Sequence, residues 1–336
     1  MTNRPIILHL VDDATAGGVM RVVDFIQNAS GMAALGEHRV QHVKRGKIAA
    51  RPFQADVVVS HLAISWRSLP AFIAMRAVNP GKQFVHIEHS YTKAFVALNV
   101  KNRRRFTTLL KVSFSLFDRV IAVSDGQADW IKSRGFCAPE KLETIQSCVD
   151  LTQFRNLPSS KGPIRTFGAI GRLDQQKGFD TLIAAFRACP DPELRLHIYG
   201  EGDQKTTLRN LASGDDRIVF KGFMQDPVAA FAQVDAVVMP SRWEAYGLVA
   251  IEALSAGRPV ICSDLDGLKD HKAGGAILVR AGSIGDLKSK IVDLSSQKAG
   301  DLITSPYRAS AVLEDRFVAA WARILRPAGE TQTALE

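Results

Sequence analysis

The sequence predicts an α/β protein with two doubly wound domains. The chain has 336 residues, and single hydrophobic cores stop growing near about 250–300 residues, so two domains fit better than one. Short β-rich apolar runs alternate with stretches of helical period, which indicates parallel sheets built by right-handed crossovers. The alternation stops at "NLPSSKGP" (156–163), a Pro-, Ser- and Gly-containing stretch typical of a linker, and then restarts.

The expected elements fall into two rounds of strand and helix. Strands are expected in the first half at 5–11, 39–44, 55–62, 83–89, 119–125 and 142–147, and in the second at 165–173, 194–200, 218–223, 236–241, 259–264 and 276–280. Segments such as "GVMRVVDFIQNAS" and "GFDTLIAAFRAC" have helical spacing. We therefore expect an N-terminal domain over 1–156, a second domain over 157–304, and a helical segment over 305–326 that packs back toward the first.

Composition excludes several classes of protein. No apolar run approaches the roughly 20 residues that a membrane span needs, and the opening "MTNRPIILHLVDD" lacks the pattern of a secretory signal. The four cysteines have no paired spacing, which argues against a zinc site or a disulfide framework. We expect a cytoplasmic protein with no metal and no cofactor.

The positive charge is concentrated in the first half of the chain. Residues 1–160 hold 21 Lys and Arg against 12 Asp and Glu, whereas residues 161–336 hold 22 of each. The stretch "KNRRRFTTLLKVSFSLF" (101–117) mixes basic and apolar residues. It could lie on the anionic inner face of the cell membrane and admit a lipid-linked acceptor. The alternative is an amphipathic helix whose apolar side faces the core.

Two loops at predicted strand ends carry residues suited to anions. Gly17 and Gly18 precede a helix that begins near Val19; glycines allow close approach, and helix N-terminal amides attract phosphate. In "GAIGRLDQQKGFD", Arg172 ends a strand and Lys177 stands before a helix, which suits a diphosphate. The alternatives are a plain tight turn and a pair of solvated cations.

One helix contains a single charge among apolar residues. In "LVAIEALSA" (248–256), Glu252 is the only charged residue. Such a helix is normally buried, and a buried carboxylate without partners is unfavourable. The two hydroxyls of a ribose would supply two donors. A buried Arg or Lys is the alternative partner.

The residues before this helix also suggest ligand contacts. Glu244 lies in the preceding loop and could accept sugar hydroxyls. After Tyr246, the amides of Gly247, Leu248 and Val249 lack partners within a helix and would face a ligand.

Several segments, in their order and separation, resemble glycosyltransferase family 4, retaining enzymes of the GT-B fold. In the second half these are "GRLDQQKGFDTLIAAF", "IYGEG" and "EAYGLVAIEALSAGRPVICSD"; in the first they are "AGGVMRVV", "ADVVVSHLA", "HIEHS" and "DRVIAVSD". Residues 91–118 contain no matching motif. The resemblance implies two Rossmann-like domains that face each other across a cleft, one for the acceptor and one for the nucleotide-sugar donor.

The resemblance also implies roles for individual residues. Arg172 and Lys177 resemble the pair that holds the donor diphosphate, Glu252 the carboxylate on the ribose, and Glu244 the carboxylate on the donor sugar. His89 resembles a first-domain histidine that faces the reacting centre, although His86 and His61 also end strands. The implied catalytic set is Arg172, Lys177, Glu244 and His89, and the implied donor-binding set is Gly17, Gly18, Arg172, Lys177, Glu244, Tyr246, Gly247, Leu248, Val249 and Glu252.

The expected reaction is transfer of a hexose from a nucleoside-diphosphate sugar to an acceptor hydroxyl, with retention, on a lipid-linked or cell-surface glycan precursor. One departure concerns the family's Gly-Gly-x-x-Glu segment, which here reads "DGLKD", with Gly267 kept and Asp270 in place of Glu. Two alternatives remain: an epimerase of nucleotide sugars with the same fold, and a basic nucleic-acid-binding protein. A nucleic-acid-binding role would not explain why Glu244 and Glu252 occur together with Arg172 and Lys177. We therefore expect no nucleic acid partner.

Overall fold

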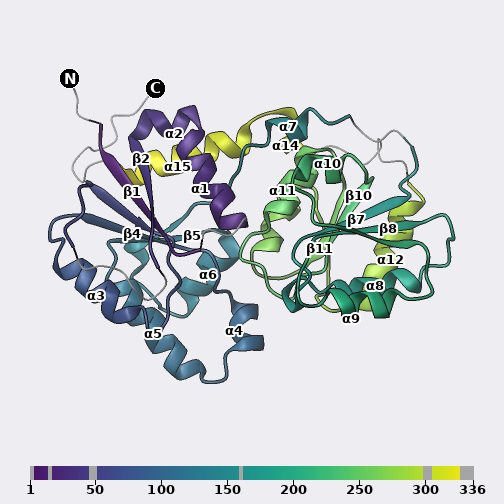
Figure 1. Cartoon of the computed structure of the whole chain (residues 1–336), viewed down its shortest axis with the longest axis horizontal. Coiled ribbons are helices and arrows are strands. Elements are labelled where there is room, and N and C mark those ends of the chain that lie inside the picture. Colours follow the sequence, from purple (N-terminus) through teal and green to yellow (C-terminus); the bar gives the residue numbers. More distant parts are fainter. Residues whose placement is uncertain (1–3, 14–16, 45–50, 159–161, 298–304, 326–336) are drawn as a thin grey trace.

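The computed structural model describes residues 4–13, 17–44, 51–158, 162–297 and 305–325. They form two six-stranded sheets whose strands pair in parallel, and helices cover both sheets. The sheets lie next to one another, with the C-terminal helix returning to the first (Figure 1). The prediction of a GT-B-type arrangement of two doubly wound α/β domains is confirmed.

The first sheet has the strand order β2-β1-β3-β4-β5-β6. Its strands are β1 (Ile6–Val11), β2 (Glu37–His42), β3 (Val57–Ser60), β4 (Gln83–Glu88), β5 (Arg119–Ala122) and β6 (Leu142–Thr144). Its helices are α1 (Gly18–Asn28), α2 (Ser30–Leu35), α3 (Leu69–Ala77), α4 (Lys93–Asn99), α5 (Arg103–Ser115) and α6 (Asp125–Ser133), followed by the 3-10 turn η1 (Pro139–Lys141) and the short α7 (Thr152–Arg155). From β1, one part of the sheet continues to β2 on one side and the rest to β3 on the other, so the direction of winding reverses between β1 and β3.

The second sheet has the order β12-β11-β10-β7-β8-β9. Its strands are β7 (Thr166–Ile170), β8 (Arg195–Tyr199), β9 (Ile218–Gly222), β10 (Ala236–Met239), β11 (Val260–Ser263) and β12 (Ile277–Val279). The remaining helices are η2 (Gln175–Lys177), α8 (Phe179–Arg187), α9 (Lys205–Ala212), α10 (Pro227–Phe231), α11 (Leu248–Ser255), η3 (Asp266–Gly274), α12 (Ile284–Ser295), α14 (Pro306–Ala309) and α15 (Val312–Leu325). Here the winding reverses between β7 and β10, the place where doubly wound sheets bind ligands.

All twelve expected strands form, but most end earlier than the apolar runs suggest. The run at 165–173 gives β7 only as far as Ile170, because Gly171 takes a φ of 154° and turns the chain out of the sheet. The apolar residues beyond the strand ends are packed in loops instead; Leu173, for example, is fully buried.

The basic stretch at 101–117 is an amphipathic helix with its apolar side in the core. Leu109, Leu110 and Phe114 of α5 are buried in the cluster that lies under the first sheet, and Phe117 joins them. Its basic residues are exposed, including Lys101, Arg103, Arg104, Arg105 and Lys111. These four buried residues are therefore unavailable to a membrane, and the outward side of the helix is mainly basic, with Val112 as an exposed apolar residue.

The chain crosses between the sheets twice, and the two crossings lie side by side. After β6 it passes to α7, which contacts α10 and α11 of the second half. After α14 it returns as α15, which packs on α2, where a Cβ on Gly31 would stand 2.9 Å from Val318. Glu314 of α15 joins both crossings, accepting from Arg155 at 2.7 Å and from the Leu151 amide at 3.3 Å. The exact domain boundaries stay a prediction, and 159–161, 298–304 and 326 fall outside the described residues.

Loops at the carboxyl ends of both sheets meet through η3. Asp266 accepts from the Thr92 hydroxyl at 2.5 Å and the Ala94 amide at 3.2 Å, both in the first domain. Asp270 accepts from the amides of Asp125 and Gly126 at the start of α6, at 2.7 and 3.3 Å. The "DGLKD" segment therefore holds the domains together through carboxylates.

Gly126 offers a test of this contact. A Cβ on Gly126 would stand 2.2 Å from the backbone oxygen of Asp266. Helix propensity alone would make Gly126→Ala stabilising by about 0.5–1 kcal/mol. We expect the opposite: a lower unfolding temperature, or an increased radius of gyration in X-ray scattering as the domains separate.

The matched control is Gly285→Ala in α12, where nothing lies within 4 Å of the added Cβ. It should keep or raise the unfolding temperature. A Gly126→Ala protein with unchanged stability and unchanged radius of gyration would contradict the close contact.

Candidate functional site

The loop after β7 presents two cations. Gly171 turns the chain, Asp174 caps η2 by accepting from the Lys177 amide at 3.2 Å, and Gly178 takes a left-handed φ of 66° before α8. Arg172 is 73% exposed and contacts Asp174 at 3.3 Å and Gln176 at 3.2 Å. This guanidinium is therefore held only by weak surface contacts and is open to an incoming anion.

Lys177 and Glu244 are paired with each other. The Lys177 Nζ lies 2.5 Å from Glu244 Oε2, and both side chains are largely buried, at 16% and 13% exposed. The Ser241 hydroxyl also donates to Glu244 at 3.3 Å. Because β7 and β10 are neighbours in the sheet, the loops that follow them bring this cation and carboxylate together at the reversal of the winding.

The loop before α11 leaves donors at the start of that helix. Gly247 adopts a left-handed φ of 92°. No described residue accepts a hydrogen bond from the amides of Gly247, Leu248 or Val249. On the other side, a Cβ on Gly18 would stand 3.5 Å from Leu248 Cδ1, so the start of α1 closely approaches the start of α11.

The buried side chain of Tyr246 supports the loop that precedes α11. Its side chain is 4% exposed, its ring lies edge-on to that of His271, and its carbonyl accepts from His271 Nε2 at 2.7 Å. Burial lowers the pKa of His271 to about 4, so the ring is neutral near pH 7 and its Nε2–H donates a hydrogen bond to this carbonyl. The structure therefore places the Tyr246 side chain in the core.

Glu252 has a partner that sequence reasoning did not identify. It is 1% exposed, and its Oε1 lies 2.5 Å from Nη1 of Arg21, a residue of α1 that is 34% exposed. Burial raises the pKa of Glu252, while the charge of Arg21 opposes that rise. The carboxylate is therefore ion-paired with a basic residue, as the alternative interpretation allowed, although no described residue makes a well-aligned hydrogen bond to its Oε1. The basic residue belongs to the first domain and remains partly open to solvent.

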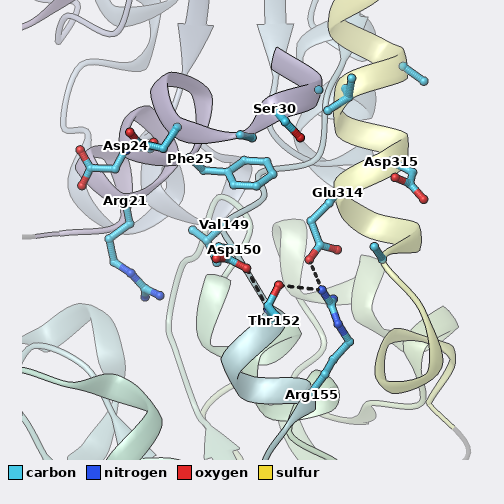
Figure 2. A pocket seen from close by; sticks show the side chains of 16 residues that line it. Arg21, Asp24, Phe25, Ser30, Val149, Asp150, Thr152, Arg155, Glu314 and Asp315 are labelled. Carbon is cyan, nitrogen blue, oxygen red and sulfur yellow. Dashed lines mark hydrogen bonds and ion pairs between the residues drawn. The ribbon is translucent and has the colours of Figure 1, made fainter. Parts of the chain in front are cut away.

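The sequence contains only a partial signal for Arg21, its spacing from Gly18, and this spacing does not identify Glu252 as the partner. Arg21 lies three residues after Gly18, on the same side of α1, so a helix that approaches Gly18 can come within reach of Arg21. In Figure 2 its side chain points from α1 away from the neighbouring helices and toward the second domain.

Arg21 also borders a pocket of about 830 Å³ next to the paired crossings. The pocket lies between α1, α2, the segment leading to α7, and α15 (Figure 2). Arg155 and Glu314 pair on one side of it, and Asp24, Asp150 and Asp315 add negative charge. Thus Arg21 is shared between this pocket and the carboxylate of α11.

Two family models match consecutive parts of the chain. "Glycosyltransferase Family 4" matches residues 12–153, and "Glycosyl transferases group 1" matches residues 164–297. The chain belongs to glycosyltransferase family 4. The two matches divide at the crossing between the sheets.

Curated relatives of this family 4 chain share its sequence in part. The poly(ribitol-phosphate) α-N-acetylglucosaminyltransferase of Staphylococcus aureus is 29% identical over 192 residues, which cover 52% of this chain and 38% of the relative. The 2-deoxystreptamine glucosyltransferase of Streptomyces kanamyceticus is 29% identical over 192 residues, covering 54% and 47%. The chain spans half or less of the length of the curated relatives it matches.

A solved structure shares the fold over nearly the whole chain. The Anabaena protein HepE in complex with UDP and glucose has a TM-score of 0.69 and 18% identity, covering 95% of this chain and 97% of that one. This likeness, at low identity, confirms the fold.

His89 follows the last residue of β4 and is partly exposed. Three residues further on, Thr92 contacts Asp266 of the second domain, so His89 lies near the meeting of the two domains. Burial lowers its pKa to about 4. His86 instead lies on the other face of the sheet, against Phe114 and Phe117, whereas His61 contacts His89 directly at 2.9 Å.

Buried histidines should make the protein sensitive to mild acid. Burial lowers the pKa of fully buried His9 to about 3, whereas an unfolded histidine titrates near 6.5. Both states are neutral above pH 6.5. As the pH falls below that value, only the unfolded chain binds the proton, so stability is lost, by about 2 kcal/mol for this residue at pH 5.

Urea unfolding at pH 7 and pH 5 checks this expectation. The loss of unfolding free energy between the two pH values should be smaller by about 2 kcal/mol in His9→Asn than in the wild type. The control, His42→Asn, changes an exposed residue of β2 and should keep the wild-type loss. An identical loss in His9→Asn would show that His9 is not held neutral by burial.

Proposed function

We propose that the protein is a retaining, metal-independent glycosyltransferase that moves a hexose from a nucleoside-diphosphate sugar to an acceptor hydroxyl. The observation that carries the proposal is the gathering of Arg172, Lys177, Glu244 and the α11 amides where β7 and β10 reverse the winding. Family membership supports the same reaction class.

The positive groups fit the leaving diphosphate. When the bond between sugar and diphosphate breaks, negative charge builds on the phosphate oxygens. The exposed guanidinium of Arg172, the ammonium of Lys177 and the unpartnered amides at the start of α11 would stabilise that charge without a bound metal. Arg172 offers a planar fork, and Lys177 a compact charge fixed in place by Glu244.

The two carboxylates fit the hydroxyl groups of the donor. Glu252 would accept from the ribose hydroxyls, and Arg21, which is partly exposed, could move to share or release this carboxylate. Glu244 would accept from a hydroxyl of the transferred hexose while still holding Lys177. Both residues are thereby assigned to binding, and the family resemblance implies front-face attack, with the departing phosphate taking the proton of the acceptor.

The relatives support a broad choice of donor and acceptor. HepE is solved with UDP, which favours a uridine nucleotide for this chain as well. The curated relatives are named for poly(ribitol-phosphate) and 2-deoxystreptamine, acceptors of different chemistry. We propose a lipid-linked or cell-surface glycan precursor as the acceptor here, in polysaccharide biosynthesis.

A panel of nucleotide sugars tests the reaction. UDP-, GDP- and ADP-hexoses are incubated with the full chain, and the released nucleoside diphosphate is measured together with the shift in unfolding temperature. One base should shift the unfolding temperature, since a ligand at a hundred times its Kd adds about 2.7 kcal/mol. Arg172→Ala should lower nucleotide release by about 100-fold or more, and Glu252→Gln should remove most of the thermal shift.

Arg195→Ala is the matched control, because Arg195 is exposed at the first residue of β8, at the amino end of this strand and away from the loops at the carboxyl ends. Its rate should equal the wild type. Isomerised sugar nucleotide formed without an acceptor would favour the epimerase, and release unaffected by Arg172→Ala would remove this residue from the reaction.

Membrane association is a separate proposal that rests on charge. The outward side of α5 carries Arg103, Arg104 and Arg105, and Arg105 lies over the ring of the exposed Trp66 at 5.2 Å. Among the described residues no helix is long and apolar enough to span a bilayer. Contact would therefore be electrostatic and confined to the surface of anionic lipids.

Liposome flotation tests whether the protein binds membranes through its charge. The protein should float with anionic vesicles at low salt and remain unbound with neutral vesicles. Changing the three arginines to Gln together should abolish flotation, and 0.5 M salt should do the same because it shortens the screening length. Equal failure on both kinds of vesicle would exclude the membrane as a partner.

A further inference from the structure

Four histidines form a continuous row across the first sheet. His38 of β2, His9 of β1, His61 after β3 and His89 after β4 lie on consecutive strands. Each ring contacts the next: His38 to His9 at 3.0 Å, His9 to His61 at 3.0 Å, and His61 to His89 at 2.9 Å. We call these four residues the histidine row.

Strand register explains why the rings meet. His38 pairs with Ile7, so His9 stands two residues further along its own strand. His9 pairs with Val59, again two residues short of His61. Val59 pairs with Val85, which puts His61 opposite Ile87 and leaves His89 two residues further on. Side chains two residues apart share a face, so the row runs diagonally over one face toward the carboxyl ends of the strands.

The outer end of the row fixes the direction of every hydrogen bond. His38 Nε2 lies 3.2 Å from the carbonyl oxygen of Met32, which can only accept. The proton of neutral His38 is therefore on Nε2, and its Nδ1 must accept from His9 Nε2. His9 Nδ1 then accepts from His61 Nε2, and His61 Nδ1 accepts from His89 Nε2. At the inner end, the Nδ1 of His89 is left as an unprotonated acceptor.

The surroundings keep the row neutral. His9 is fully buried and His61 is 7% exposed, and burial lowers the pKa of all four rings, with His9 at about 3 and His89 at about 4. Trp321 of α15 lies edge-on to His9 with ring centroids 6.0 Å apart, so the C-terminal helix covers the middle of the row. Only the two ends, His38 and His89, are partly exposed.

We propose that His38, His9 and His61 are positioning residues that hold His89 in its Nε2–H tautomer, so that its Nδ1 accepts a hydrogen bond from a hydroxyl of the bound substrate. This inference rests on the proposed function for the identity of the substrate. Among the described residues none donates to His89 Nδ1. A bare nitrogen repels phosphate oxygens and attracts a hydroxyl, so the contact is with a sugar or the acceptor and not with the diphosphate.

Nuclear magnetic resonance reads the tautomer without any substrate. The full chain is labelled with ¹⁵N-histidine, and long-range ¹H–¹⁵N correlations at pH 7 report which ring nitrogen carries the proton. All four rings of the row should be protonated on Nε2, with His89 Nδ1 unprotonated. A proton on His89 Nδ1 at pH 7 would overturn the inference.

Position 38 provides a pair of matched variants. His38→Phe keeps a ring but removes both nitrogens, so the row loses its anchor and His89 should become a mixture of tautomers. His38→Gln should restore the Nε2–H form, because its amide can donate to Met32 and accept from His9. His38 is partly exposed on an edge strand, and thermal unfolding verifies that both variants fold.

Kinetics then separate positioning from a structural role. His38→Phe should lower kcat/KM for hexose transfer about tenfold, leave the thermal shift by the nucleoside diphosphate alone unchanged, and be rescued by His38→Gln. Equal kcat/KM in the wild type and His38→Phe would overturn the inference. If the wild type releases no nucleoside diphosphate from any nucleotide sugar, the proposed function is wrong, and so is the proposed contact between His89 and a substrate hydroxyl. The tautomer measurement needs no substrate, so it still tests whether the histidine row holds His89 in its Nε2–H form.

Discussion

A carboxylate inside an apolar helix is the constraint on which the arrangement of the domains depends. Glu252 is almost fully buried in α11, and leaving it unpaired would cost several kcal/mol. Its own domain offers apolar neighbours along the helix, so the compensating charge comes from Arg21 of the other domain. The N-terminal ends of α1 and α11 are thereby held against each other, and Gly18 is small enough to permit this close approach.

Other carboxylates around the site also act as links between segments. Lys177 holds Glu244, and η3 holds the first domain through Asp266 and Asp270, both of which have a pKa raised by burial. Asp266 stands where the family segment has its first glycine, and it is the one described non-glycine residue with a positive φ, at 40°. A strained backbone is kept here because the side chain binds Thr92 and Ala94.

The sequence predicted the fold well because hydrophobic periodicity is a local signal. Strand and helix alternation located all twelve strands, and the glycines and cations after β1 and β7 indicated two loops at strand ends that suit an anion. Pairing of side chains was not predictable in the same way. The contact of Glu252 with Arg21 joins residues that are 231 positions apart, and the histidine row requires the register of four strands, which no single segment contains. Nothing in the local sequence therefore singled out His9 or His38 as site residues, or indicated that the Tyr246 side chain lies in the core.

The doubled connection between the lobes limits how they can move. A single tether would let one lobe swivel freely about it, but here the segment entering α7 and the segment leaving α14 run together and are tied by Glu314 to Arg155 and Leu151. Two adjacent backbone segments resist twisting of one domain against the other, but they can still bend about the line along which they lie together. We therefore expect any opening of the two domains to be a bending about this shared line, which would bring the same loops opposite one another each time the domains close.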